Sequence, residues 1–318
     1  MKFIVESTGK VLPGFWAEYV RVFNENFGAK FTSGDFEKKY RSPVLGGAIH
    51  AFCLTDDDKL IGATSILPLN YMVDGEIVTG GVSCDSFVDK DHRKKNPFLF
   101  RTLLAKVESH ALEIGVNFVI SVPNENSFLY TVHCCNWKLV GEYDFYIVPV
   151  GVRSRLGGNL IGRCASFLVS SVTRVFFLFG SSDGKETQKR IRICRDEPYL
   201  KYRLAQADYH RVIQEEREFI YRIYEEAGTP CAYLMDYQPR SPLVLHKALK
   251  YIFERNRKEI DIILFLGVDE VIHLPALKIP KCFEPRKMRF TIRLLNEKYS
   301  AALDIKNWEL GILLMDTR

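Results

Sequence analysis

The chain has 318 residues, of which 47% are apolar and 26% charged, the balance of a soluble globular protein with enough length for two domains. Its net charge of +5 is too small to indicate nucleic-acid binding by itself. Eight cysteines are scattered without CxxC spacing, and no apolar export signal opens the sequence. We therefore expect free thiols and a cytoplasmic protein.

The first part of the chain predicts a helix followed by an antiparallel meander. Helical periodicity runs from Phe15 to Gly28, a residue type that often ends helices. Strand patterns then follow at Ala48–Leu54, Leu60–Leu69, Tyr71–Val73 with Ile77–Val78, and Gly81–Val88. Turn residues at Asp56–Asp58 and Asp74–Gly75 separate these strands.

A second helix and a buried strand come next. From Pro97 to Gly115, apolar residues recur every three or four positions and form one buried stripe. The following "VNFVISV" is almost wholly apolar, as in a strand covered on both faces. After it, "KLVGEYDFYIVPV" predicts a strand pair from Lys138 to Val150.

One long apolar helix is predicted at Arg163–Gly180. A narrow polar stripe at helical spacing contains Arg163, Ser166, Ser170 and Arg174. Because Arg174 interrupts the apolar run, its uncharged part is too short for a membrane span of about 20 residues. A helix packed between two domains is the favoured interpretation, and a helix in peripheral contact with a membrane through 163–180 is the alternative. The residues from Gly180 to Arg190 predict an exposed, flexible link.

The second half of the chain repeats the order of the first. The segments "NPFLFRTLLAKVESHALEIGVNFVISV" and "SPLVLHKALKYIFERNRKEIDIILFLG" align without a gap at an offset of 145. In each copy, a capping residue precedes a proline at the first helical position. Internal duplication explains this pattern, and chance similarity of two amphipathic helices is the alternative. We predict a first domain at 1–155, an apolar linker helix and flexible link at 156–190, and a second, degenerate domain at 191–318.

This order of elements, followed by "VPNENSFLYTVHCCNWKLVGE", resembles the GNAT (Gcn5-related N-acetyltransferase) family. The pairing of two such halves and the closing "KNWELGILLMD" look like the tandem-GNAT proteins of bacterial sugar and envelope metabolism. The resemblance implies an α/β protein of two GNAT-like domains, each with a mixed, mostly antiparallel central sheet flanked by helices. It also implies an acyl-CoA-dependent N-acyltransferase, with acetyl-CoA as the expected acyl donor.

The resemblance places the phosphates of acetyl-CoA at the turn before the helix at Pro97. The family has Arg/Gln-x-x-Gly-x-Gly/Ala here, whereas this chain keeps Arg93 but has Asn96 and Phe98 where glycines are expected. The backbone cradle should therefore be poorer, and the charges of "HRKK" either compensate in part or form an ordinary solvated turn. The donor-binding residues predicted in this way are Phe87, Val88, Arg93, Lys94, Lys95, Phe98, Leu99, Asn124 and Ser127, the last two facing the pantetheine.

N-acyl transfer requires a group that takes the proton of the attacking amine and a donor for the leaving thiolate. Asp85 is the candidate base, and an aspartate that bonds a neighbouring loop is the alternative. Tyr130 is the candidate acid, with His133 as the fallback. The adjacent Cys134 and Cys135 lack zinc spacing, so we expect small buried thiols rather than a metal site or a nucleophile.

The second half lacks the basic turn, with Arg240 as the only base before its helix. We expect a non-catalytic copy that shapes the acceptor cleft or stabilises the first half. The expected acceptor is a small amine such as an amino sugar, with no role for DNA, and the sequence leaves the oligomeric state open. Two other functions also stay open: a degenerate binding module without catalysis, which the missing glycines favour, and an aminoacyl transferase that uses charged tRNA. Binding to tRNA would weaken steeply with salt.

Overall fold

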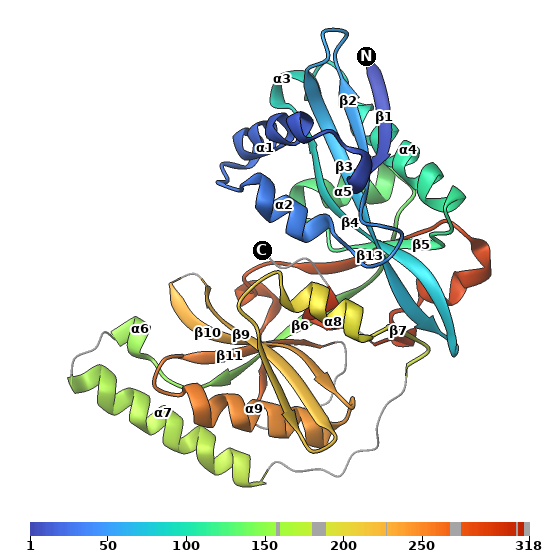
Figure 1. Ribbon diagram of the computed structural model, residues 1–318. Helices are drawn as coiled ribbons and strands as arrows, with labels where there is room; N and C mark the ends of the chain where they lie inside the picture. Colours follow the sequence, from blue (N-terminus) through green and yellow to red (C-terminus); the bar gives the residue numbers. More distant parts are fainter. Residues whose placement is uncertain (157–159, 180–188, 227, 268–274, 310, 315–318) are drawn as a thin grey trace. The chain divides into compact units, whose positions relative to one another are not determined.

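The structure, a computed structural model, describes residues 1–156, 160–179, 189–226, 228–267, 275–309 and 311–314. It divides into two compact units, each assembled from three stretches of the chain (Figure 1). The first unit consists of Met1–Gly141, Arg190–Gln206 and Arg289–Trp308, and the second of Glu142–Lys189, Ala207–Met288 and Glu309–Arg318. The domain limits predicted from the sequence differ from this division and stay a prediction.

A mixed sheet in the order β1-β2-β3-β4-β5-β13 forms the centre of the first unit, and β7 adds to β3. Its strands are β1 (Lys2–Ser7), β2 (Ile49–Leu54), β3 (Leu60–Val73), β4 (Glu76–Val88), β5 (Phe118–Ser121), β7 (Ile191–Ile193), β13 (Met288–Leu294) and β14 (Trp308–Glu309), which pairs with β7. Its helices are α1 (Pro13–Phe27), α2 (Ser33–Tyr40), α3 (Lys90–Arg93), α4 (Leu99–Glu113), α5 (Glu125–Cys134) and α8 (Glu197–Leu204). Along the order β1-β2-β3-β4-β5-β13, neighbouring strands are antiparallel except β4 and β5, which are parallel.

Alternate residues of β2 face the two helical layers of the first unit. His50 and Phe52 contact aromatic rings of α1 and α2, whereas Ile49, Ala51 and Cys53 join the core beneath α4. This follows from the strand repeat of two, which sends neighbouring side chains to opposite faces. In Figure 1, α1 and α2 accordingly lie on one side of this sheet and α4 on the other.

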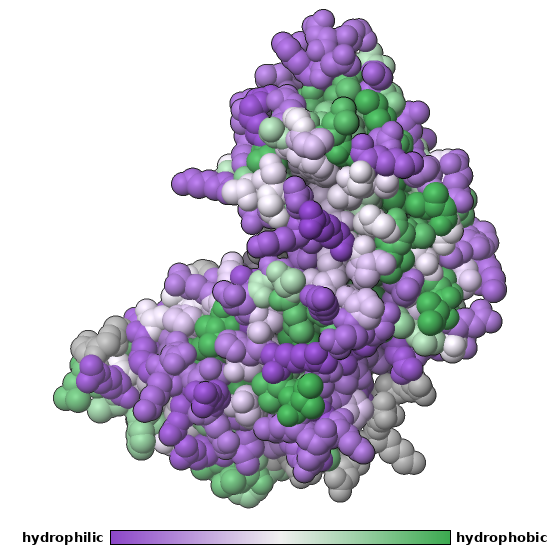
Figure 2. All heavy atoms as spheres, viewed as in Figure 1, coloured by the Kyte–Doolittle hydropathy of each residue, from purple (hydrophilic) through white to green (hydrophobic). Residues whose placement is uncertain are grey.

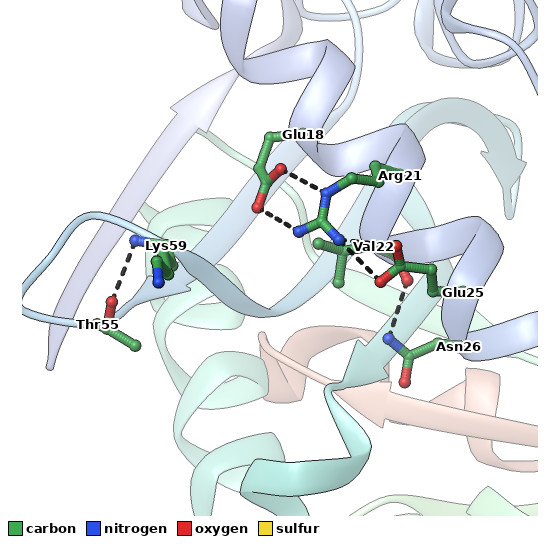
Figure 3. A network of polar contacts seen from close by, with 7 residues as sticks. All are labelled: Glu18, Arg21, Val22, Glu25, Asn26, Thr55 and Lys59. Atoms are coloured by element: carbon green, nitrogen blue, oxygen red, sulfur yellow. Dashed lines mark hydrogen bonds and ion pairs between the residues drawn. The ribbon is translucent and has the colours of Figure 1, made fainter.

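The solvent face of α1 carries an ion-pair network that Figure 3 shows from close by. Arg21 donates to Glu18 at 2.8 and 2.9 Å and to Glu25 at 2.7 and 2.8 Å. One turn further on, the Asn26 amide donates to the Val22 carbonyl at 2.9 Å. The helix ends at Gly28, whose φ of 61° is left-handed and therefore suits glycine.

The second unit is a smaller sheet in the order β6-β11-β10-β9-β8, with β12 added to β6. Its strands are β6 (Lys138–Pro149, which begins in the first unit), β8 (His210–Gln214), β9 (Arg217–Glu226), β10 (Thr229–Gln238), β11 (Ile262–Gly267) and β12 (Leu277–Lys278), and its helices are α6 (Arg153–Leu156), α7 (Leu160–Phe179) and α9 (Pro242–Asn256). The apolar stripe of α9 packs on this sheet and forms its main core. Short 3-10 helices lie at Thr8–Lys10, Lys281–Phe283, Glu297–Leu303, Ile305–Asn307 and Ile312–Leu314. The strand pair predicted from Lys138 to Val150 is wrong, because these residues form the single strand β6.

Both units contain a strand, a helix and a second strand parallel to the first. In the first unit these are β4, α4 and β5, and in the second β10, α9 and β11. The predicted cap and first-position proline are confirmed for α9, which begins at Pro242 with the Ser241 side chain as its cap. They are wrong for α4, which begins at Leu99, two residues after Pro97, with Phe98 at the cap position and no side-chain cap. This repetition is what a duplication would produce, and the duplication itself stays a prediction.

Candidate active site

The two parallel strands of the first unit pair over a very short length. Among the described residues, β4 meets β5 only at Gly81–Val119 and Val82–Ile120. Beyond these pairs β4 continues to Val88, whereas β5 ends at Ser121. The carboxyl ends of two adjacent parallel strands therefore separate, which leaves strand edges where an extended ligand can bond to backbone groups.

A β-bulge interrupts β4 beside this separation. Ala63 of β3 lies opposite Phe87 and Ser65 lies opposite Cys84, so two residues of β4 occupy the place of one. Asp85 is one of them, and its φ of 52° lies in the left-handed region that aspartate tolerates better than most residues. The bulge thus changes the direction of the strand edge at the point where β5 has stopped pairing.

The Asp85 carboxylate lies in a buried polar cluster with two residues of α2. Its Oδ2 is 2.6 Å from the Lys39 ammonium and accepts a hydrogen bond from the Tyr40 hydroxyl at 2.7 Å. The side chains of Asp85 and Lys39 are 4% and 9% exposed. The Tyr19 hydroxyl extends the chain of contacts, 2.8 Å from that of Tyr40, and burial together with the Asp85 charge raises the pKa of Tyr40 well above its usual value.

Sequence reasoning found Asp85 but missed Lys39, Tyr40 and Tyr19. The α2 helix is fixed by a capping box between Thr32 and Asp35, which places the "KKY" at its end against β4. The predicted role of Asp85 as a base stays a prediction. In this structure its carboxylate bonds to a helix, so accepting a further proton would weaken an existing ion pair.

A buried histidine lies in the same layer as this cluster. His50 Nδ1 is 2.8 Å from the Ser65 hydroxyl and Nε2 is 2.9 Å from the Thr8 hydroxyl. Burial lowers the pKa of His50 to about 3, so the ring is neutral at physiological pH. The rings of Trp16 and Tyr40 contact it. No pattern in the sequence singled it out.

The basic turn after β4 divides into residues with structural contacts and residues that face solvent. Arg93 Nε donates to the Val88 carbonyl at 2.6 Å, and Nη2 donates to the Asn26 side chain at 2.9 Å. Lys94 and Lys95 are exposed, and neither forms an ion pair within the part of the chain that the structure describes. The two lysines are therefore the cations of this turn that are free to meet a phosphate.

The hydrophobic residues predicted to bind the acyl donor lie mostly in the core. Phe87 packs against the Tyr19 ring at 5.6 Å, and Val88 and Leu99 belong to the core under α4. Phe98, by contrast, is exposed and precedes α4 without a side-chain cap. The Leu99 amide bonds to the Asn96 carbonyl at 3.1 Å, and the Phe98 side chain caps none of the amides that follow it in the first turn of α4. A helix start without a side-chain cap is a common place for an anion to bind.

The predicted residues of α5 have local partners in the structure. Asn124 caps the helix, because its side chain accepts from the Ser127 amide and hydroxyl, both at 3.0 Å. The Tyr130 hydroxyl donates to the Pro97 carbonyl at 2.7 Å and so ties α5 to the turn before α4. His133 is exposed in the last turn of α5. These contacts bring α5 and the basic turn together, and the catalytic and donor-binding roles predicted here stay predictions.

The adjacent cysteines and Arg240 complete the residues singled out in the sequence. Burial raises the pKa of the Cys135 thiol to about 12. Cys134 is exposed, so the prediction of a buried thiol is wrong for this residue and right for Cys135. The described residues contain no group of three or more His, Cys, Asp or Glu that could hold a metal. In the second unit, Arg240 is held by Asp236 at 2.5 Å and faces Glu309 at 3.5 Å, so its charge is neutralised within its own unit.

The sequence matches no known family model and no curated protein. The structure, however, is similar to solved structures over most of its length. A GCN5-related N-acetyltransferase from Anabaena variabilis matches with a TM-score of 0.59 at 12% identity, over 93% of this chain and 73% of that one. A conserved protein of unknown function from Enterococcus faecalis, described as a probable N-acyltransferase, matches with a TM-score of 0.61 at 11% identity over the same shares.

A third similar structure is the N-myristoyltransferase of Saccharomyces cerevisiae with bound myristoyl-CoA. It matches with a TM-score of 0.52 at 12% identity, over 91% of this chain and 78% of that one. At such low identity the similarity is one of fold rather than of individual site residues. The chain has the fold of the GCN5-related N-acetyltransferases.

Proposed function

We propose that this protein is an acyl-CoA-dependent N-acyltransferase. The observation that carries the proposal is the separation of β4 and β5 beyond Val82 and Ile120, next to the bulge at Asp85. Unpaired strand edges suit an extended pantetheine arm with its amides, and a backbone amide of the bulged strand suits an oxyanion. The acyl donor is proposed to be acetyl-CoA, and the acceptor a small amine such as an amino sugar.

The residues of the chain supply positioning, charge and proton transfer in this proposal. The Asp85–Lys39–Tyr40 cluster fixes the end of α2 against the bulge, so the acceptor amine would meet a preorganised surface. Asp85 is the proposed proton acceptor, and Tyr130 or His133 the proposed donor to the leaving thiolate. The CoA phosphates would lie at the amides that begin α4, beside Lys94 and Lys95.

The exposed lysines give the first prediction. Replacing Lys94 and Lys95 with Ala should weaken CoA binding about tenfold at low salt and flatten its salt dependence, because screened charge pairs contribute less as ionic strength rises. Calorimetric titration of CoA at low and high salt measures both effects. The matched control is Lys247→Ala with Lys250→Ala, which removes the same charge from α9. Equal affinity of both double variants would mean that the turn is an ordinary solvated surface.

A second prediction concerns the pantetheine site. Ser127 is half-buried in the first turn of α5, and its backbone amide donates to the Asn124 side chain whatever side chain residue 127 carries. Ser127→Phe adds bulk there, whereas Ser127→Ala removes the same hydroxyl without adding bulk. We expect Ser127→Phe to weaken CoA binding at least about tenfold and Ser127→Ala to change it little. Similar losses in both variants would argue against a ligand beside α5.

The activity itself is tested by thiol release from acetyl-CoA with a panel of small amines, amino sugars and peptides. Release that depends on the amine supports the proposal. CoA binding without transfer would instead identify a degenerate binding module. Absence of CoA binding with salt-sensitive binding of charged tRNA would identify an aminoacyl transferase. A cytoplasmic location is proposed alongside this function.

A further inference from the structure

The α7 helix packs on the second unit through its polar side. The Thr173 hydroxyl donates to the Pro149 carbonyl and the Ser170 hydroxyl to the Val150 carbonyl, both at 2.7 Å. The Ser166 hydroxyl accepts from the Val152 amide at 3.1 Å. The serines of the stripe predicted from the sequence thus face the protein. The only large apolar side chain among the buried residues of α7 is Phe177, which contacts the rings of α9.

The opposite side of α7 is apolar and exposed. Among the described residues, 25 large apolar side chains are exposed, and nine of them lie on these 20 residues: Leu160, Ile161, Phe167, Leu168, Val172, Val175, Phe176, Leu178 and Phe179. In Figure 2, separate hydrophobic areas lie along the lower edge of the surface, where Figure 1 draws α7. Such a concentration is more than scattered surface residues account for and marks an interaction site.

The charges that α6 and α7 bring to this face have a single sign. Arg163 and Arg174 are exposed and eleven residues apart, which places them along the same edge of the helix. Arg155 of α6 is exposed before them. The described residues contain no ion pair to any of these three arginines, and the sequence contains no Asp or Glu between Asp144 and Asp183.

We propose that the apolar face of α7 docks the protein on the surface of an anionic phospholipid bilayer. Phe167, Leu168 and Leu178 would enter the boundary between headgroups and acyl chains, and the arginines at the edge would meet lipid phosphates. The hydroxyl contacts of its polar side already hold the helix on the protein, so its apolar side faces outward. The lipid requirement is for negative charge, not for one headgroup.

Two other occupants fit the same face less well. A second copy of the chain would bring further arginines and no carboxylate from this segment to pair with them. A membrane span would need to break the hydroxyl contacts of Ser170 and Thr173 and carry two arginines into hydrocarbon. Among the described residues, α7 is the one helix long and apolar enough to cross a membrane, but the contacts of its polar side argue for a surface position.

The test uses the full chain with vesicles of phosphatidylcholine, with or without phosphatidylglycerol. We expect flotation with the anionic vesicles and release by high salt or alkaline carbonate. The double variant Phe167→Gln, Leu178→Gln should bind at least tenfold more weakly, because two exposed apolar side chains no longer leave water. Arg163→Gln with Arg174→Gln should weaken binding roughly 25-fold on anionic vesicles, at about fivefold for each arginine, and little on neutral ones.

The matched control places the same change on an equally exposed surface. Phe167 and Leu178 are both 72% exposed, and Leu12 and Phe283 are 74% and 76% exposed. The variant Leu12→Gln, Phe283→Gln should float like the wild type. A Phe179→Trp variant gives an independent readout, since its emission should shift to the blue with anionic vesicles, whereas a tryptophan at Phe283 should not respond.

Three results would overturn the proposal. The first is that the protein is monomeric and does not bind anionic vesicles. The second is a dimer in sedimentation velocity that Phe167→Gln, Leu178→Gln dissociates while vesicles stay unbound, which would assign the face to a second copy. The third is retention in the membrane after carbonate extraction, which would make α7 a span.

Discussion

Replacing Asp85 with Asn is expected to destabilise the first unit by about 3–5 kcal/mol, the cost of leaving one member of a buried ion pair without its partner. Lys39 lies 2.6 Å from the carboxylate, and both side chains are almost fully buried. An amide keeps the shape and an acceptor oxygen for the Tyr40 hydroxyl, but it removes the charge that compensates the ammonium. The expected loss is therefore electrostatic and not a loss of packing.

The double variant Asp85→Asn, Lys39→Met separates this cause from general damage. Both charges are then absent, so no buried charge is left unpaired, and the double variant should be more stable than Asp85→Asn alone. Tryptophan fluorescence during urea unfolding can follow the first unit selectively, because all three tryptophans of the chain, Trp16, Trp137 and Trp308, belong to it.

The surface network of Figure 3 provides the control. Arg21→Gln breaks the contacts with Glu18 and Glu25, which are partly exposed, and should cost less than about 1 kcal/mol. If Asp85→Asn cost no more than Arg21→Gln, the buried pair would contribute nothing special to the fold. The expected coupling between Asp85 and Lys39 would also be contradicted if the losses of Asp85→Asn and Lys39→Met simply added in the double variant.

Local patterns predicted much of the first unit because they encode single elements. Gly28 and Gly115 end helices where expected, with left-handed φ values of 61° and 95°. The apolar stripe after Pro97 and the buried strand after it both form.

These local patterns could not predict which strands pair when they lie far apart in the sequence. The strand β13 lies against β5 although about 170 residues separate Thr291 from Ser121, and β1 was not predicted at all. A strand repeat reports which residues share a face, but it carries no information on which strand is the neighbour. The partners of Asp85 were missed for the same reason, since Lys39 and Tyr40 reach it from a separate helix.

The orientation of α7 shows a second limit of prediction from the sequence. Ser166 and Ser170 formed a polar stripe in the sequence, and a polar stripe on a helix usually faces water. Here these hydroxyls bond to the backbone just after β6, where Ser170 donates to the Val150 carbonyl and Ser166 accepts from the Val152 amide. The same pattern of residues thus supports opposite orientations, and only the tertiary structure decides between them.

Stability of the first unit is expected to fall by about 2 kcal/mol between about pH 7.5 and pH 5 because of His50 alone. Burial lowers the pKa of His50 from 6.5 to about 3 in the folded protein. Between these two values the unfolded chain takes up a proton that the folded chain does not, so unfolding is favoured as the pH falls below 6.5. The stabilisation is complete above pH 6.5 and declines steadily toward pH 3.

His50→Gln should remove this dependence, because glutamine offers polar contacts to Thr8 and Ser65 without titrating. The difference between wild type and His50→Gln across the pH series isolates the histidine from other groups, including Glu108, whose raised pKa acts in the opposite direction. His133→Gln is the control, since His133 is exposed and should leave the wild-type slope intact. Urea unfolding followed by tryptophan fluorescence at each pH measures the slopes. A His50→Gln protein that loses as much stability as the wild type on acidification would show that the buried ring is not the group that senses pH.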